Sequence, residues 1–239
     1  MFYFLLSTLL SYNIVLVAAA VVPAVFLMIR VYKSDRLEKE SPVILWTLVK
    51  AGVFSALIAL VAERVLGTLL DLMMPQNEIL YNVLLYFVVV AFSEEGAKYA
   101  MLKRNSWRLQ EFNCQYDGVV YAVFVSLGFA LWENISYALH FGFQTALIRA
   151  LTAIPGHACF GVFMGVFYGA AKRTERHGQP DKSKSFRRMA VIVPALIHGT
   201  YDYIATAEAG TWYFIGFIAV LFVVSFLLIG KQSKNDQYI

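Results

Sequence analysis

Long apolar runs constrain this chain more than any other feature of its sequence. A helix needs about 20 apolar residues to cross the hydrocarbon core of a bilayer. Of the 239 residues, 59% are hydrophobic, whereas a soluble domain is nearer half apolar, and the mean hydropathy is +0.62. Runs of sufficient length cover residues 10–30, 43–66, 79–102, 117–140, 147–171, 189–207 and 211–230. We therefore predict an all-α, polytopic membrane helix bundle with about seven transmembrane helices, or eight if the polar residues 11–13 mark a break.

Spans and short loops take up nearly all of the length, so we predict a single integral-membrane domain over residues 1–239. The first run has no basic segment before it and no small-residue cleavage site, which favours a retained span over a removed signal peptide. Cys114 and Cys159 lie in different kinds of segment, and we expect two unpaired thiols.

Basic residues alternate strictly between the polar segments. They occur after the first, third and fifth runs and in the C-terminal tail, and residues 172–188 alone hold seven. The segments around 71–78, 138–145 and 205–211 hold no Lys or Arg. The positive-inside rule then predicts an external N-terminus and a cytoplasmic C-terminus. The net charge of +4 and pI of about 9.0 reflect these loops, so no nucleic-acid partner is expected.

Ionisable residues inside the third to sixth runs indicate a functional site. Charged groups in a membrane span are costly and normally face the bundle interior or a wet cavity. Each of these residues alone could serve helix packing, but seven groups serving packing alone would be a heavy cost without return. They are Glu94, Glu95, Lys98, Glu133, His157, His198 and Asp202.

The spacing of the first three predicts different tasks for the two glutamates. Glu94 and Lys98 are four residues apart, and Glu95 and Lys98 are three apart, so the lysine can reach either carboxylate. The two glutamates point about 100° apart on a helix. One carboxylate can therefore be held ionised by Lys98 while the other faces a cavity.

The other polar positions also share helix faces. Phe129 and Glu133 are one turn apart, with Asn134 beside them. His198 and Asp202 are likewise one turn apart, and Gly199 allows another helix to approach closely.

These groups suit hydrolysis by an activated water molecule. Three carboxylates in one low-dielectric site cannot all ionise, so one is expected to carry a proton. A proton-sharing carboxylate beside water can act as a general base and later as an acid. Nearby histidines can donate hydrogen bonds to an oxyanion. The sequence has no evident Ser-His-Asp arrangement and no glycine-rich phosphate loop.

At this point the residues resemble a known family, the PrsW intramembrane proteases. "SEEGAK" is similar to the family's EExxK signature, and "YDGVVYAVFVSLGFALWENISYAL" resembles its second block. "GHACFGVFMG" resembles the third block, around His157, and "PALIHGTYDY" resembles the fourth, HxxxD, as His198 and Asp202. The resemblance covers roughly residues 79–207; before it, "EKESP" is a loose match to an acidic-proline element.

The resemblance implies a glutamic-type endopeptidase of the bacterial cytoplasmic membrane, related to the CAAX-processing proteases and without a cofactor. The implied reaction is site-1 cleavage of a single-span anti-sigma factor, which leads to release of an extracytoplasmic-function sigma factor. Glu94, Glu95 and Glu133 would activate water, and His198 would bind the oxyanion. The implied supporting residues are Lys98, His157, Asp202, Phe129 and Asn134.

Within this scheme the resemblance assigns Glu94 as the water activator and Glu95 as its support. The related proteases carry His where this chain has Glu133, so Glu133 either activates water or supports it by hydrogen bonding. With the rise per residue of an ideal α-helix, Glu94 and Glu133 would lie at membrane depths that differ by roughly 10 Å.

Two alternatives remain open from the sequence. A zinc protease could use His157, His198 and a carboxylate, although no HExxH helix is present. A proton-coupled transporter or a non-enzymatic scaffold could also contain intramembrane Glu, His and Lys. No paired broken spans indicate the inverted repeats of many transporters.

Overall fold

The structure, a computed structural model, describes residues 2–76, 79–206 and 210–239. Its described part is almost entirely helical, with one isolated bridge between Cys114 and Tyr238. The elements are α1 (Phe2–Ser34), α2 (Pro42–Met73), α3 (Ile79–Leu84), the π-helix η1 (Leu85–Phe92), α4 (Ser93–Ser106), α5 (Asp117–Leu151), α6 (Ala153–Arg176), α7 (Pro180–Thr206) and α8 (Thr211–Lys234). The prediction of a polytopic helical membrane protein is confirmed.

Within the described residues, five helical stretches are long and apolar enough to cross a membrane. They are Val17–Ser34, Pro42–Met73, Ile79–Ser106, Asp117–Arg176 and Thr211–Lys234. The fourth stretch joins α5 and α6, and α7 is not among the five. The number of seven spans and their orientation therefore stay predictions.

One open alternative is decided, and one predicted boundary is wrong. The polar residues 11–13 do not break the first helix, because α1 runs without interruption from Phe2 to Ser34. The fifth run was expected to begin at 147, but α6 begins at Ala153. Gly142 has a φ of 83°, a left-handed conformation that favours glycine, and it breaks α5. This break lies between the predicted runs 117–140 and 147–171, where hydropathy places a loop; the runs do not predict the helical stretch 143–151 that follows it.

The third predicted run is one continuous helical stretch made of α3, η1 and α4. The π-helical turns of η1 end at Phe92, immediately before Glu94 and Glu95. π-helical turns are rare and occur frequently at functional sites. These turns change the angle between successive residues around the helix axis. Counting ideal α-helical turns from Ile79 therefore gives the wrong direction for the side chains after Phe92.

The centre of the bundle is α5, whose first half is buried almost completely. It packs against α1, α2, α4 and α6. Gly52 and Gly128 lie where α2 and α5 cross, and a Cβ atom at either would collide with backbone of the other helix. Small residues of this kind let membrane helices approach closely.

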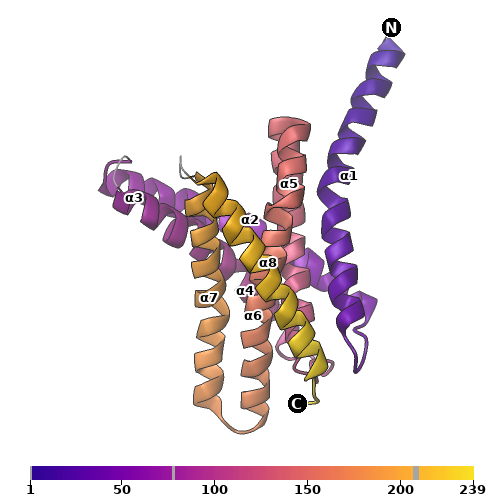
Figure 1. Ribbon diagram of the computed structural model, residues 1–239, viewed down its shortest axis with the longest axis vertical. Coiled ribbons are helices and arrows are strands. Elements are labelled where there is room, and N and C mark those ends of the chain that lie inside the picture. Colours follow the sequence, from indigo (N-terminus) through magenta and orange to yellow (C-terminus); the bar gives the residue numbers. More distant parts are fainter. Residues whose placement is uncertain (1, 77–78, 207–209) are drawn as a thin grey trace.

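The four basic segments lie at the same end of the molecule (Figure 1). Here the C-terminal tail joins the α4–α5 loop: Ile239 N donates to Asn113 O at 2.7 Å, and Tyr116 N to Asp236 Oδ1 at 2.8 Å. Lys172 Nζ, from the end of α6, donates to Trp107 O in the same loop at 2.6 Å. The helix order thus brings the basic segments together, as their alternation along the sequence predicts.

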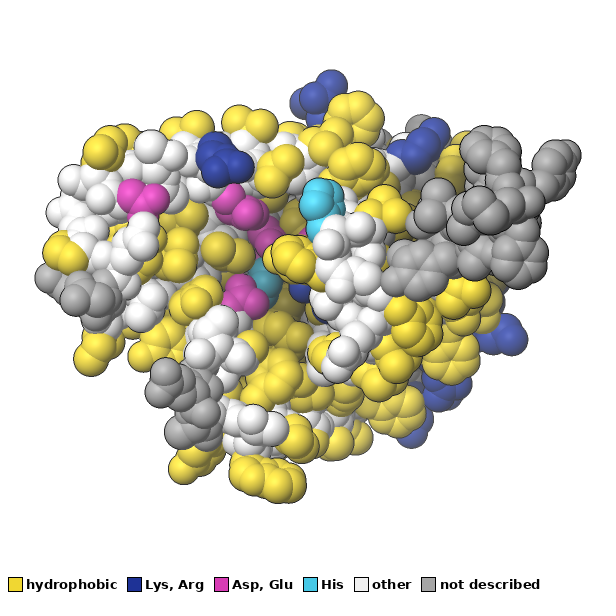
Figure 2. All heavy atoms as spheres, turned by 90° about the horizontal axis from the view of Figure 1, so that it is seen from above, with side chains coloured by type: hydrophobic (Ala, Val, Ile, Leu, Met, Phe, Trp, Pro, Cys, Tyr) yellow, Lys and Arg dark blue, Asp and Glu magenta, His cyan; other side chains and the backbone are white. Residues whose placement is uncertain are grey.

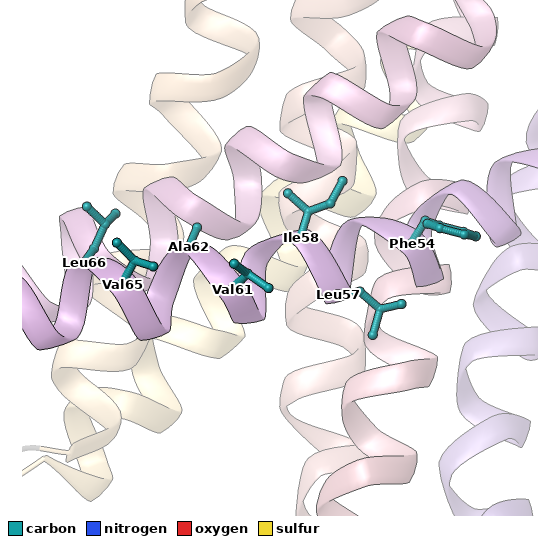
Figure 3. Close-up of a pocket in the computed structure, with 7 residues that line it drawn as sticks. All are labelled: Phe54, Leu57, Ile58, Val61, Ala62, Val65 and Leu66. Carbon is teal, nitrogen blue, oxygen red and sulfur yellow. The ribbon is translucent and has the colours of Figure 1, made fainter.

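The part of the outer face of α2 between Lys50 and Arg64 carries an apolar patch that continues to Leu66. A shallow hollow of about 720 Å³ is lined by Phe54, Leu57, Ile58, Val61, Ala62, Val65 and Leu66, all on this helix (Figure 3). Phe54 is 61% exposed and Val61 64% exposed. A face of this composition suits contact with lipid and offers no group for catalysis.

Candidate active site

Five of the seven predicted ionisable residues line one cavity of about 590 Å³: Glu94, Glu133, His157, His198 and Asp202. Its walls come from α2, η1, α4, α5, α6 and α7. Seen from above, acidic and histidine side chains gather in a hollow surrounded by hydrophobic ones (Figure 2). The hollow therefore faces the end of the bundle opposite the basic segments (Figures 1 and 2).

Lys98 lies at the centre of the polar cluster and is completely buried. Its ammonium group donates to Glu95 Oε1 at 2.8 Å and to Glu94 Oε2 at 3.1 Å, as the helical spacing predicts. It also lies 3.1 Å from His157 Nδ1 and 3.9 Å from the centre of the Phe129 ring. The three protons of the ammonium group thus have three acceptors.

The adjacent glutamates differ in what they face. Glu94 lines the cavity, whereas Glu95 does not and is completely buried. Oε1 of Glu95 is 2.8 Å from Lys98 Nζ and 3.1 Å from His198 Nδ1. Only Glu94 is therefore placed to meet water in the cavity, and Glu95 joins α4 to α7.

The contacts of His157 determine its tautomer. Nδ1 faces the Lys98 ammonium, which only donates, so this nitrogen must accept. Nε2 then carries the proton and donates to Glu133 Oε2 at 2.8 Å. His157 thus connects Lys98 on α4 with Glu133 on α5. Glu94 and Glu133 both line the cavity, so the expected difference in depth does not separate them.

Arg149 is a site residue that the sequence analysis missed. Its place near the start of the run 147–171 predicts a side chain that reaches the membrane surface. Instead, its Nη2 pairs with Glu133 Oε2 at 2.8 Å and its Nε donates to Asn134 Oδ1 at 3.1 Å. The break at Gly142 lets residues 143–151 return along α5, which carries Arg149 to the cavity.

Glu63 on α2 was also missed as a site residue. It lines the cavity together with Ala56 and Leu60 from the same helix. Glu63 lies seven residues after Ala56, so the two side chains share a face of the helix. This spacing is the signal in the sequence that could have placed Glu63 at the site.

His198 lies among three acidic side chains. Nδ1 is 3.1 Å from Glu95 Oε1 and 3.9 Å from Glu94 Oε2, and Nε2 is 3.4 Å from Asp202 Oδ2. The next residue, Gly199, lets α7 approach η1 closely, since a Cβ atom there would lie 2.6 Å from Cδ1 of Phe87. Stacking of His198 on the Phe160 ring, with centroids 4.6 Å apart, fixes the plane of the imidazole.

Residues 40–229 match the family model described as "PrsW family intramembrane metalloprotease". The chain belongs to the PrsW family of intramembrane proteases. Its long apolar helices and this membership make it a multi-pass bacterial membrane protein.

Curated PrsW relatives match over most of the chain. Protease PrsW of Geobacillus kaustophilus is 31% identical over 92% of this chain and 92% of its own length. That of Halalkalibacterium halodurans is 35% identical over 63% of this chain and 69% of its own length. That of Bacillus subtilis is 37% identical over 54% of this chain and 57% of its own length. No solved structure matches the chain.

The description of the PrsW family as metalloproteases raises the question of a metal site. Glu94, His157 and His198 can each offer a ligand atom, with the three atoms within 4.8 Å of one another. Two histidines and a glutamate form a known catalytic zinc set. However, Lys98 Nζ lies 3.1 Å from both Glu94 Oε2 and His157 Nδ1. A fixed ammonium group touching two of three ligands repels a divalent cation, so this side-chain arrangement does not fit zinc.

Proposed function

We propose that this PrsW-family protease is a glutamic-type endopeptidase in which Glu94 activates water without a metal. One observation carries the proposal: of the adjacent carboxylates, Glu94 faces the cavity and Glu95 is held by Lys98 and His198. A general base must reach a water molecule, and of these two carboxylates only that of Glu94 lines the cavity.

The proposed reaction is direct hydrolysis of a peptide bond. Glu94 takes a proton from water as the water oxygen bonds to the carbonyl carbon and the carbonyl oxygen becomes an oxyanion. When this intermediate collapses, the C–N bond breaks and Glu94 returns the proton to the leaving nitrogen. Both ring nitrogens of His198 face carboxylate oxygens, so in this proposal both carry protons; Nε2–H, only loosely held by Asp202 at 3.4 Å, donates to the oxyanion.

The remaining residues position these two groups. Glu95 orients His198 from the other side of the ring, and Asp202 holds the proton on Nε2. Arg149 and His157 both bind Glu133, which favours hydrogen-bonding support over water activation for this carboxylate. Asn134 accepts from Arg149, and the Phe129 ring lies against the Lys98 ammonium group.

We propose a single-span membrane protein, specifically an anti-sigma factor, as the substrate. The cavity is hollowed toward the end of the bundle opposite the basic segments, which the positive-inside rule assigns to the outside. A site open to that side suits a first cut just outside the substrate's span. The apolar helices around the cavity suit a substrate that is itself held in the bilayer.

Cleavage of a purified single-span anti-sigma substrate tests the proposed base and oxyanion donor. Loss of one oxyanion donor typically lowers the rate by about 10²–10³. We expect His198→Ala to lose at least this much and Glu94→Gln to lose at least as much. Both variants should still insert and fold, as judged by thermal unfolding in detergent. A Glu94→Gln variant that cuts at the wild-type rate would show that another group is the base.

The same assay separates the metal-free mechanism from the zinc alternative. A chelator should leave wild-type cleavage intact, and metal analysis of the purified protein should find no stoichiometric zinc. If the chelator abolishes cleavage and zinc restores it, Lys98 must leave its position and the metal-free mechanism is wrong. If the protein cuts no single-span substrate but moves protons across vesicles, the transporter alternative replaces the protease.

A further inference from the structure

A second hollow, of about 520 Å³, lies between α4 and α7, outside the catalytic cavity. One part of its wall is apolar and aromatic, formed by Phe92, Tyr99, Val191 and Ile192. Phe92 is 52% and Ile192 47% exposed, so no protein group of the described chain covers this part. The Tyr99 hydroxyl is buried and has no hydrogen-bond partner in the described structure.

The other part of the wall is strongly basic. Lys103, Lys184, Arg187 and Arg188 line it, and no Asp or Glu is among the lining residues. Lys184 is 3.5 Å from Asp181, but both side chains are well exposed, and such a pair contributes little. The Arg187 guanidinium lies 5.4 Å from the centre of the Trp107 ring. Four like charges thus gather around one hollow, and in the described chain only Lys184 has a carboxylate within 4 Å.

On both α4 and α7, the apolar part of the wall lies inside a predicted membrane run and the basic part lies just outside it. On α4, Tyr99 lies inside the apolar run 79–102 and Lys103 lies just beyond its end. On α7, Val191 lies inside the run 189–207 and Arg187 just before its start. The predicted spans therefore place the cations at the membrane surface and the apolar residues at the depth of the hydrocarbon.

We propose that this hollow binds one anionic phospholipid. The phosphate of the headgroup contacts the basic side chains, and an acyl chain lies along Phe92, Val191 and Ile192. Basic pockets between helices at the membrane surface bind acidic headgroups in this way. The order of charged and apolar wall matches a phospholipid and not a free anion, which would leave the apolar part uncovered.

Such a lipid would bridge the two helices that carry the catalytic residues. Lys103 is five residues beyond Lys98 on α4, about 7.5 Å along the helix. Arg188 lies on α7, which ten residues later carries His198. The phosphate would remove the repulsion between α4 and α7 at the surface and so hold Glu95 and His198 at their observed distance.

Native mass spectrometry can count the phosphatidylglycerol that stays with the protein after mixed vesicles of phosphatidylglycerol and phosphatidylcholine are dissolved. The test variant is K103Q/K184Q/R188Q, which removes three exposed cations and keeps Arg187 against Trp107. Each cation near an anionic surface contributes roughly fivefold to binding, so we expect retention to weaken by about 10²-fold. The matched control, K182Q/K231Q/K234Q, removes the same charge from exposed positions that do not line the hollow.

The control should bind phosphatidylglycerol as the wild type does. Equal loss in both variants would mean a diffuse charge effect, and no loss in either would mean no site; each result overturns the proposal. Thermal unfolding in phosphatidylcholine alone verifies that the test variant is folded. If it is not, the double variant K103Q/R188Q replaces it, with an expected loss of roughly 25-fold.

Inorganic phosphate distinguishes a lipid from a soluble anion. We expect millimolar phosphate in phosphatidylcholine vesicles neither to stabilise the protein nor to displace phosphatidylglycerol. Stabilisation by phosphate equal to that by the lipid would assign the hollow to a soluble anion and overturn the proposal. These readouts need no substrate, so they stand or fall separately from the proposed protease mechanism.

Discussion

Lys98 is the residue on which the other site contacts depend. Its ammonium group holds Glu94, Glu95 and His157, and the contact with His157 in turn directs the Nε2 proton toward Glu133. Removing one partner from a buried ion pair leaves an uncompensated charge, at a cost of about 3–5 kcal/mol. A single side chain thus fixes the ionisation and geometry of four others.

Lys98→Met should therefore lower both stability and cleavage. We expect cleavage to fall by at least about 10²-fold, because a positioned base and oxyanion donor are both released. The control is Lys50→Met, which removes an exposed lysine from α2. Cleavage and thermal unfolding of both variants check the expectation; a Lys98→Met variant that cuts as well as the control would limit the lysine to a packing role.

Glu40 gives a prediction outside the membrane spans. Burial, and to a smaller extent the charge of Asp35, raise the pKa of Glu40 from 4.5 to about 7, although the Tyr121 hydroxyl acts in the opposite direction. The folded protein thus binds a proton that the unfolded chain releases above pH 4.5. The free energy of unfolding should fall as the pH rises from about 4.5 to 7.

Glu40→Gln should remove this fall in the free energy of unfolding with rising pH. Thermal unfolding at pH 8 should show the variant more stable than the wild type, by on the order of 1–3 kcal/mol, because no buried charge forms. At pH 5, where Glu40 is already protonated, the difference should nearly vanish. An equal gain at both pH values would mean that the substitution acts through packing instead.

At the scale of elements, the contact between α7 and η1 sets the position of His198. A Cβ atom at Gly199 would lie 2.8 Å from Cγ of Phe87 and 3.0 Å from its Cα atom. Because the backbone is also close, turning the ring does not relieve the collision, and α7 must move away. His198 would then move away from Glu95 on α4.

Gly199→Ala should therefore lower cleavage by about 10²-fold, the typical cost of a shift of roughly 1 Å in a catalytic group. Gly96→Ala is the matched control, because it adds the same methyl group beside Glu95 where nothing lies within 4 Å. The cleavage rates of the two variants provide the check. Equal activity in both would show that close packing at Gly199 does not position the site.

At the scale of the whole molecule, the basic segments mark one end and the hollow of the cavity the other (Figures 1 and 2). The arrangement in the bilayer predicted from the basic loops gives an accessibility test. Cys114 and Cys159 are both free and buried, so they interfere little with labelling of exposed positions.

An impermeant thiol reagent applied to intact cells should label Gln144→Cys and miss Ser185→Cys. Both positions are exposed, and they lie in a neutral segment and in the most basic segment, respectively. Opened cells, in which Ser185→Cys should react, provide the control. The opposite pattern in intact cells would invert the orientation and the side from which substrate reaches the cavity.

The sequence by itself determined the membrane class, the helical fold and much of the polar cluster. Apolar length and helical spacing are local properties, so the reach of Lys98 to both Glu94 and Glu95 follows from three- and four-residue offsets. The same offsets place His198 over Asp202. The four family-like blocks then indicate which of these residues belong to one site.

Only the tertiary structure decided which glutamate faces the cavity, and that Arg149 and Glu63 belong to the site. These facts depend on rotations and reversals that hydropathy does not encode. The π-helical turns of η1 rotate Glu94 and Glu95, and the left-handed Gly142 returns Arg149 to Glu133. The position of a side chain relative to other helices depends on such accumulated rotations, and a local pattern of apolar residues leaves them undetermined.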